Sequence, residues 1–158
     1  MIIAVTGHRP QKLAAPGTEQ RVRPVLKWAL ETLKPQWVIT GMALGVDQWM
    51  CEEALALGVP VLAAIPCWDQ ETFWRPEAKV KYHELLGRVQ AKEVVSPGAY
   101  HAGVMQERNR WMVDRATCVV AIFDGTAGGT ANAVTYAIQN RKPVFRYDPK
   151  TFNSEWIK

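Results

Sequence analysis

Short apolar runs recur along this chain, separated by longer segments in which apolar and polar residues alternate with a helical period. Every position of Cys118–Phe123 is apolar, which is typical of a parallel strand covered by helices on both faces. Short apolar runs bounded by glycine, proline or polar residues predict six strands in all. Their predicted bounds are Ile2–Thr6, Trp37–Thr40, Pro60–Ile65, Lys92–Val95, Thr117–Phe123 and Pro143–Tyr147.

Between the predicted strands, apolar residues repeat every three or four positions, as on the buried face of a helix. Pro24 lies early in the first such segment, so we expect its regular helix to begin near Arg23 and to end at Pro35. Pro76 suits a first helical turn, and Gly58 suits the position after a last turn. The other predicted helices are Val46–Leu57, Pro76–Gln90, Gly103–Arg115 and Thr130–Asn140.

This regular alternation of strands and helices predicts the α/β class, with a three-layer, doubly wound and mostly parallel sheet. We expect residues 1–158 to form a single domain, with 148–158 as a peripheral tail. In such sheets, ligands bind outside the carboxyl ends of the strands. Most of the unusual residues of this chain fall at those predicted ends, so we expect its functional site there.

The composition adds limits on the class of protein. Hydrophobic residues make up 48% of the 158 residues and charged residues 22%, which is typical of one soluble globular domain. No apolar run approaches the roughly 20 residues that a membrane helix needs. The start Met1–Val5 leads directly into a predicted strand and lacks a basic segment, so we expect no signal peptide and a cytoplasmic protein.

The cysteines and the net charge limit which metals and ligands the protein is expected to bind. Cys51, Cys67 and Cys118 are scattered and have no metal-ligand spacing, so we expect free thiols and no metal site. The net charge of +4 is compatible with an anionic ligand but identifies none.

Two loops that follow predicted strands carry glycine beside polar residues. After the first strand, Gly7 lets the backbone approach a ligand closely. Its neighbours Thr6, His8 and Arg9 supply polar groups, and the guanidinium of Arg9 has a forked shape suited to phosphate. The alternative is an ordinary turn with a solvated His8 and Arg9.

After the second strand, Gly41 and Gly45 flank Met42 at a predicted helix start whose N–H groups can face an anion. Asp47, near that start, either stabilises the helix N-terminus or contacts a ribose or base.

The loop after the fifth predicted strand is the strongest local signal. It contains Asp124, Gly125, Gly128, Gly129 and Thr130, between a buried strand and a helix. This arrangement can hold a phosphate with main-chain N–H groups and the positive end of the helix. It matches neither the P-loop nor the G-x-G-x-x-G pattern. The alternative is a flexible connection.

Two further segments have two interpretations each. In the helix 103–115, Arg110 can pair with Glu107 and Asp114 on a solvated face, or else Asn109 or Arg110 reaches the ligand. In the loop after the third strand, the aromatic residues can stack on a purine or form a subunit contact. That loop contains Trp68, Gln70, Phe73 and Trp74.

Taken in order, these loops resemble the SLOG superfamily, a Rossmann-like group that includes the LOG nucleotide hydrolases and the DNA-processing protein DprA. Within it the chain looks most like the YpsA-like (DUF1273) family, and the resemblance covers almost the whole chain. The segments that carry it are Thr6–Pro10, Gly41–Asp47, the loop with Pro66, Gln70 and Trp74, Asn109–Asp114, and Asp124–Thr130 with its three glycines.

The resemblance implies a nucleotide or a nucleotide-derived, ADP-ribose-like ligand, no certain cofactor, and a homo-oligomer. We therefore predict a binding or sensor module. The predicted ligand-binding residues are Thr6, Gly7, His8, Arg9, Gly41, Met42, Gly45, Asp47, Pro66, Gln70, Trp74, Asn109, Arg110, Asp124, Gly125, Gly128, Gly129, Thr130 and Asn132.

Two alternatives also follow from the resemblance. LOG enzymes cleave the N-glycosidic bond of a nucleoside monophosphate and carry glutamates where this chain has Asn132 and Ala133. A hydrolase would then need Asp47, Glu107 or Asp124 as its carboxylate. DprA binds single-stranded DNA, so single-stranded nucleic acid is the other candidate partner.

Overall fold

A computed structural model describes all of residues 1–158. The helices are α1 (Thr18–Leu33), α2 (Val46–Ala56), α3 (Pro76–Leu86), α4 (Val104–Arg115) and α5 (Gly129–Gln139), with a 3₁₀ turn, η1, at Pro10–Lys12. The strands are β1 (Ile2–Gly7), β2 (Trp37–Thr40), β3 (Val61–Ile65), β4 (Ala91–Val94), β5 (Cys118–Ile122), β6 (Val144–Tyr147) and β7 (Ser154–Ile157).

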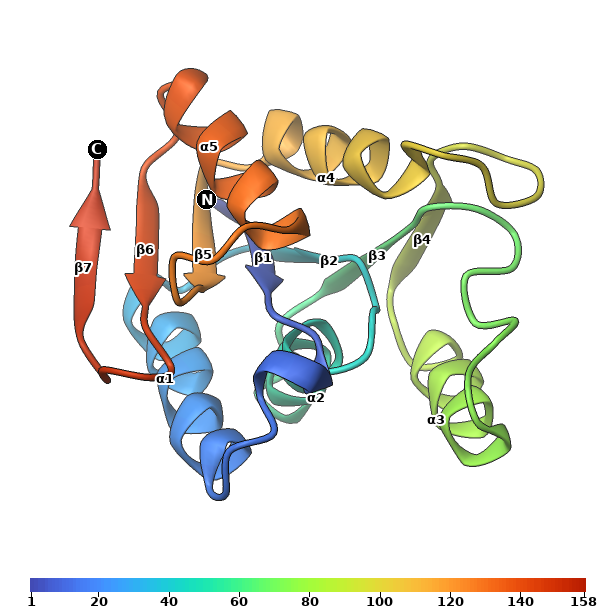
Figure 1. Cartoon of the computed structure of the whole chain (residues 1–158), viewed down its shortest axis with the longest axis horizontal. Coiled ribbons are helices and arrows are strands. Elements are labelled where there is room, and N and C mark those ends of the chain that lie inside the picture. Colours follow the sequence, from blue (N-terminus) through green and yellow to red (C-terminus); the bar gives the residue numbers. More distant parts are fainter.

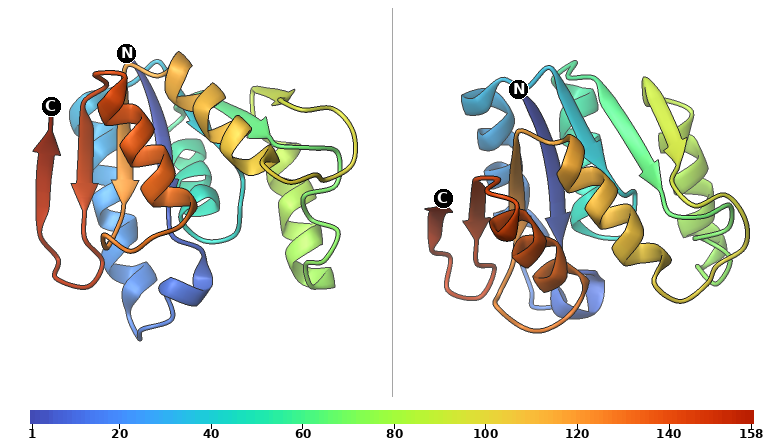
Figure 2. Two further views of the ribbon diagram at one scale, coloured as in Figure 1. Left: turned by 45° about the horizontal axis from the view of Figure 1, so that its top comes forward. Right: turned by 90° about the horizontal axis from the view of Figure 1, so that it is seen from above.

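The strands form one sheet in the order β4-β3-β2-β1-β5-β6-β7. Every pairing is parallel except that of β6 with β7. Helices α1, α2 and α3 cover one face of the sheet, and α4 and α5 cover the other (Figures 1 and 2). The predicted class, a Rossmann-like α/β fold with a mostly parallel sheet between two helical layers, is confirmed.

Two hydrophobic clusters, one on each face of the sheet, explain the continuous apolar runs. Along β5, Cys118, Val120 and Ile122 belong to the cluster under α1, α2 and α3, whereas Val119 and Ala121 belong to the cluster under α4 and α5. Because successive side chains of a strand point to opposite faces, a strand buried on both faces must be apolar at every position.

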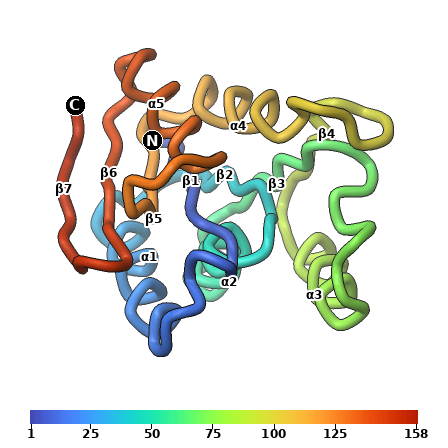
Figure 3. The backbone as a smooth tube through the Cα atoms, in the orientation of Figure 1, coloured from blue at the N-terminus to red at the C-terminus, as the bar shows by residue number.

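The topology creates a crevice between β1 and β5. The chain proceeds outward from β1 through β2 and β3 to β4, then crosses back over α4 to form β5 on the other side of β1. Thr6 lies beside Ala121 and Gly7 beside Ile122, so both strands end at the same edge. The segment that follows β5 passes close to the end of β1 on its way to α5 (Figure 3). Such a reversal of strand order is where doubly wound sheets bind ligands.

Helix α1 differs from its prediction. It begins at Thr18 rather than near Arg23, so Pro24 lies inside it. Proline removes one i to i−4 hydrogen bond there. The first turns nevertheless bury Thr18 and all of Val22, which stabilises the longer helix.

Two other segments also differ from the sequence pattern. Helix α3 ends at Leu86 instead of Gln90, with Gly87 as its C-cap, and the side chain of Gln90 accepts a hydrogen bond from the main-chain N–H of Val61 at the start of β3. The tail adds the antiparallel edge strand β7, which the pattern did not predict. Trp156 of β7 packs on Phe145 with 5.4 Å between ring centroids.

All three cysteines are buried and unpaired, and no helix is long and apolar enough to cross a bilayer.

Candidate functional site

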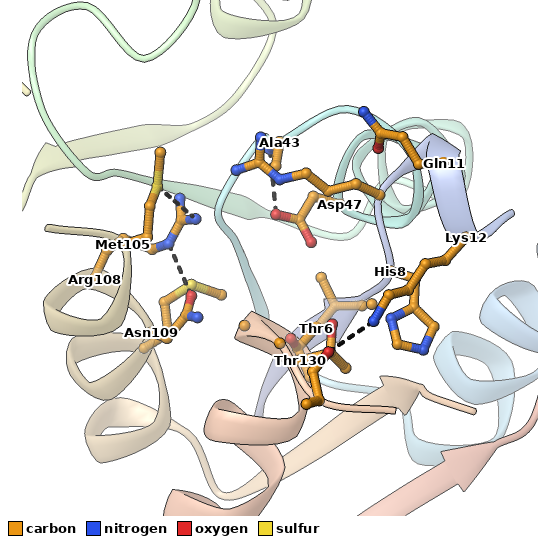
Figure 4. A pocket seen from close by; sticks show the side chains of 17 residues that line it. Thr6, His8, Gln11, Lys12, Ala43, Asp47, Met105, Arg108, Asn109 and Thr130 are labelled. Carbon is orange, nitrogen blue, oxygen red and sulfur yellow. Dashed lines mark hydrogen bonds between the residues drawn. The ribbon is translucent and has the colours of Figure 1, made fainter. Parts of the chain in front are cut away.

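A cleft of about 350 Å³ lies at the carboxyl ends of β1 and β5, bordered by η1, α4 and the start of α5 (Figure 4). It brings together about half of the predicted ligand-binding residues. Those that line it are Thr6, Gly7, His8, Arg9, Asp47, Asn109, Gly128, Gly129 and Thr130. Residues not predicted from the sequence also line it, among them Gln11, Lys12, Ala43, Met105, Arg108 and Ala127.

The first turn of α5 forms one wall of this cleft. Its N-cap is Gly128, with φ 146° and ψ −166°, and no side chain caps the helix. The first N–H groups of an α-helix have no intrahelical acceptor, and the helix dipole makes that end positive. Gly128 and Gly129 are exposed, so these N–H groups are accessible to an anion in the cleft.

Lys12 in η1 lies next to this helix start. Its ammonium donates to the Thr126 hydroxyl at 2.7 Å and to the Ala127 carbonyl at 2.8 Å. It therefore holds the glycine loop while keeping a positive charge beside Gly128. Sequence reasoning missed Lys12, although it lies only three residues after Arg9 in the same loop.

Arg108 is the buried cation of the site, with only 3% of the residue exposed. Its guanidinium donates to the carbonyls of Gly41 (2.7 Å) and Ala64 (3.1 Å) and to the Asn109 side chain (3.0 Å). No carboxylate lies within ion-pair distance of it. Burial lowers the pKa of Arg108, and the charge of Asp47 opposes that shift. Sequence reasoning missed Arg108, although its spacing of four residues from Val104 and from Met112 places it on the buried stripe of α4 and was a signal available in the sequence.

Asp47 is the only carboxylate that lines the cleft. One of its oxygens accepts a hydrogen bond from the Ala43 main chain at 3.2 Å. Burial raises its pKa, while Arg108 and the Ala43 N–H act in the opposite direction.

Gly41 lies between Asp47 and Arg108, where there is no room for a side chain. A Cβ at Gly41 would lie 2.5 Å from Arg108 Cζ and 2.9 Å from Asp47 Oδ2. Gly7 allows a second close approach, because a Cβ there would lie 2.5 Å from that of Val46 at the start of α2. These two glycines let buried groups of β1, β2, α2 and α4 come together beneath the cleft.

His8 and Asp124 form a buried pair below the glycine loop. His8 Nε2 lies 2.8 Å from Asp124 Oδ1 and 3.0 Å from the Asp124 main-chain nitrogen. Burial lowers the pKa of His8, although the carboxylate raises it in part. The Asp124 side chain is fully buried, pairs with Lys150 at 2.8 Å and accepts hydrogen bonds from Thr126. Asp124 therefore anchors the glycine loop from below.

An Asp124→Asn substitution is expected to lower the free energy of unfolding at pH 7 by about 1.5–3 kcal/mol, as for hydrogen bonds to charged groups. Burial alone would raise the pKa of Asp124, but Lys150, Thr126 and His8 hold it well below its usual value. The folded state therefore stabilises the carboxylate, and this stabilisation is lost progressively as the pH falls from about 4 toward the lowered pKa of the folded state. Urea unfolding at pH 7 and pH 3 measures it.

The difference between wild type and Asp124→Asn should shrink at pH 3. An equal difference at both pH values would contradict the assignment. Glu31→Gln, on the exposed surface of α1, is the control.

The remaining predicted residues lie outside this cleft. Gln70 is buried and donates to the Gly41 carbonyl (3.2 Å) and the Tyr82 hydroxyl (3.0 Å), so it braces the loop after β2. Trp74 packs edge-on against Tyr82. Met42 is fully buried, with φ 61°. The others that do not line the cleft are Gly41, Gly45, Pro66, Arg110, Asp124, Gly125, Asn132 and Glu107.

On the exposed face of α4, Arg110 does not form the ion pairs that its spacing allowed. Arg110 lies within ion-pair distance of neither Glu107 nor Asp114. Instead its guanidinium lies over the ring of Tyr136 on α5, 5.8 Å from the centroid, and the Tyr136 hydroxyl donates to Asp114 at 2.8 Å. Arg110 and Asn132 line a second cleft between α4 and α5, described below.

Phe73 and Trp68, in the loop before α3, are 98% and 70% exposed and do not line the cleft. A purine bound in this cleft would therefore not stack on these two rings. The predicted subunit contact at these aromatic residues stays a prediction.

Together, the doubly wound sheet and the cleft at its switch point define a Rossmann-like α/β protein. The chain belongs to the YspA SLOG family, whose model (YpsA) matches residues 3–157. The predicted family is thus confirmed.

Curated relatives agree with this membership. The uncharacterized SPbeta prophage-derived protein YoqJ of Bacillus subtilis is 31% identical over 63% of this chain and 67% of its own length. The UPF0398 protein of Leuconostoc citreum is 28% identical over 80% of this chain and 74% of its own.

Solved structures share the fold at about 20% identity. DNA processing protein A (DprA) of Streptococcus pneumoniae matches 92% of this chain with a TM-score of 0.70, and the chain spans 49% of that protein. DNA processing protein A of Helicobacter pylori, described with a single-stranded DNA binding mode, matches 96% of this chain and 70% of its own with a TM-score of 0.67. The molybdenum cofactor carrier protein of Chlamydomonas reinhardtii matches 92% of this chain and 75% of its own with a TM-score of 0.60.

Proposed function

We propose that the cleft binds a nucleotide or a nucleotide-derived, ADP-ribose-like ligand, with a phosphate at the N-terminus of α5, and that the protein is a binding or sensor module. One observation carries the proposal. Three cations, Arg9, Lys12 and Arg108, line the cleft together with an uncapped helix start, against a single carboxylate, Asp47. A site with this balance of charge favours an anion.

The individual groups fit a phosphate ester. The N–H groups of the first turn of α5 and the ammonium of Lys12 lie on the same side of the cleft. Arg108 adds a positive charge at the buried side of the cleft, where its guanidinium is held by the carbonyls of Gly41 and Ala64. The cleft volume of about 350 Å³ lies within the range of small-molecule sites.

Binding is supported more than cleavage. Of the three candidate carboxylates, only Asp47 lines the cleft, and it is buried beside Arg108. Asp124 is held by Lys150 and Thr126, and Glu107 lies on the exposed side of α4. The first turns of α5 carry Asn132 and Ala133, neither of which is a general acid or base.

Single-stranded nucleic acid is the second candidate. The cations Arg9 and Lys12 are exposed at the mouth of the cleft, and the Helicobacter pylori relative is described as binding single-stranded DNA. Binding of a nucleic acid through several phosphates would weaken steeply with salt. A single mononucleotide makes fewer phosphate contacts, so its affinity would depend on salt less.

Calorimetry against phosphate, nucleoside monophosphates, ADP-ribose and a short oligodeoxynucleotide tests the proposal. We expect binding of at least one mononucleotide or ADP-ribose at millimolar concentration or below. Absence of binding by every small ligand at millimolar concentration would overturn the proposal. Tight, salt-sensitive binding of the oligonucleotide alone would favour the second candidate.

Lys12→Ala is expected to weaken binding of the best mononucleotide about tenfold or more, the range for hydrogen bonds to charged groups. It removes a charge at the cleft and two hydrogen bonds that position the glycine loop. Lys27→Ala, on the exposed surface of α1, is the matched control and should leave the affinity unchanged. Equal affinities for wild type and Lys12→Ala would exclude a phosphate at this position.

A further inference from the structure

A second cleft, of about 240 Å³, lies between α4 and α5 and adjoins the first. Asn109 lines both, so the two clefts meet at this side chain. The other residues that line the second cleft are Gln106 and Arg110 of α4, and Asn132, Ala133, Tyr136 and Gln139 of α5.

The polar groups of this second cleft are mainly carboxamides. The side chains of Gln106, Asn132 and Gln139 make no hydrogen bond within the chain. Asn109 uses its oxygen to accept from Arg108, which leaves its amide group free to donate. Each carboxamide offers both donors and an acceptor without carrying a charge. The cleft is therefore equipped to bind a neutral group that itself has donors and acceptors.

Two planar groups line the cleft, the ring of Tyr136 and the guanidinium of Arg110, which lies over that ring 5.8 Å from its centroid. Planar rings stack on such groups. No carboxylate lines the cleft, so it does not select a cation.

The spacing along α5 connects this cleft to the phosphate position. From Gly129 to Asn132 the helix rises about 4.5 Å, and from Gly129 to Tyr136 about 10.5 Å. Asn132 and then Tyr136 therefore lie at increasing distances along α5 from the proposed phosphate position.

We infer that this second cleft binds the purine base of the nucleotide whose phosphate lies at the N-terminus of α5, an inference that rests on the proposed function. Carboxamides of asparagine and glutamine pair with the adjacent donor and acceptor groups of a purine. Gln106 and Asn132 approach the edge of the base from α4 and α5, and Tyr136 supports its face. This assigns base recognition to residues separate from those that hold the phosphate.

Ribose 5-phosphate, AMP and GMP are the probes that separate the two sites, because the sugar phosphate lacks only the base. Calorimetry on the wild-type protein should show AMP or GMP binding at least about tenfold more tightly than ribose 5-phosphate. In the double variant Gln106→Ala, Asn132→Ala this ratio should fall below about threefold, with the affinity for ribose 5-phosphate unchanged. Gln20→Ala, an exposed carboxamide on α1, is the control and should keep the wild-type ratio.

The outcomes distinguish the base site from the phosphate site. Equal affinities of wild-type protein for ribose 5-phosphate, AMP and GMP would overturn the base site but leave the phosphate site standing. A double variant that keeps the wild-type ratio would also overturn it. If none of the three probes binds, the base site fails, while the proposed function fails only if ADP-ribose and the remaining nucleoside monophosphates do not bind either. Because alanine favours a helix, circular dichroism should show that the double variant and the control are folded.

Discussion

Gly129→Asp is expected to reduce the affinity for the best-binding nucleotide at least about 100-fold while leaving the fold intact. Gly129 is the first residue of α5 and lines the cleft, and its backbone does not need a glycine conformation. A Cβ there would meet only Asn109 Nδ2, at 4.0 Å. The aspartate therefore fits, and its carboxylate lies where the phosphate is proposed to bind.

The size of this effect follows from charge. Two like charges about 4 Å apart at an effective dielectric constant near 20 repel by about 4 kcal/mol, which corresponds to about a 1000-fold change. A carboxylate at a helix N-terminus in turn stabilises the helix by about 0.3–1 kcal/mol. Binding and stability should thus change in opposite directions, which a general loss of folding does not produce.

Gly129→Asn is the matched control, because asparagine has the same shape without the charge. It should weaken binding far less than Gly129→Asp. Calorimetry with the nucleotide and thermal unfolding without it measure the two effects. Similar affinities for Gly129→Asp and wild type would exclude an anion at the start of α5.

Gly41→Ala is expected to destabilise the protein by about 3 kcal/mol, at the upper end of the range for overpacked cores. For a chain of this length that lowers the melting temperature by about 6–12 °C. The new Cβ would lie 2.5 Å from Arg108 Cζ and 2.9 Å from Asp47 Oδ2. Both groups are buried, so neither can move aside into solvent.

Gly41→Ala also lowers the stability of the fold by disturbing the hydrogen bonds of Arg108. Arg108 Nη1 donates to the Gly41 carbonyl at 2.7 Å and to the Ala64 carbonyl at 3.1 Å. Displacing the guanidinium would leave a buried charge and two carbonyls without their partners, which is costly in a protein interior. Nucleotide affinity should decrease too, because Arg108 lines the cleft.

Gly87→Ala is the control for this substitution. Gly87 has φ −71°, and a Cβ there would make only ordinary contacts of 3.4 Å or more. Its stability should be unchanged or slightly higher. Thermal unfolding of both variants measures the contrast, and equal melting temperatures for Gly41→Ala and wild type would show that Arg108 is free to move.

Several features of the fold and site were predictable because they depend on local sequence. A strand covered on both faces must be apolar throughout, so β5 and its parallel neighbours were recognisable from their residues. Glycines between a buried strand and a helix mark a helix start open to anions, so Gly128 and Gly129 were expected at the same edge of the sheet as Gly7, and the three glycines line one cleft.

Other features depended on residues far apart in the chain. Lys12 reaches the glycine loop 114 residues away. Arg108 donates to the carbonyl of Gly41 across 67 positions, and Gln70 reaches the same carbonyl across 29. The pairing of β7 with β6 spans fewer residues, but it too involves a tertiary contact, the packing of Trp156 on Phe145.

The sequence by itself therefore determined the class of fold and the edge of the sheet where the cleft lies, because periodicity and glycine act within a few residues. Only the tertiary structure decided which side chains face the cleft. Asp124 and Lys12 both belong to polar loops beside glycine, yet Asp124 is buried under its loop and Lys12 lies in the cleft. That difference comes from long-range packing and pairing of charges, which local patterns do not encode.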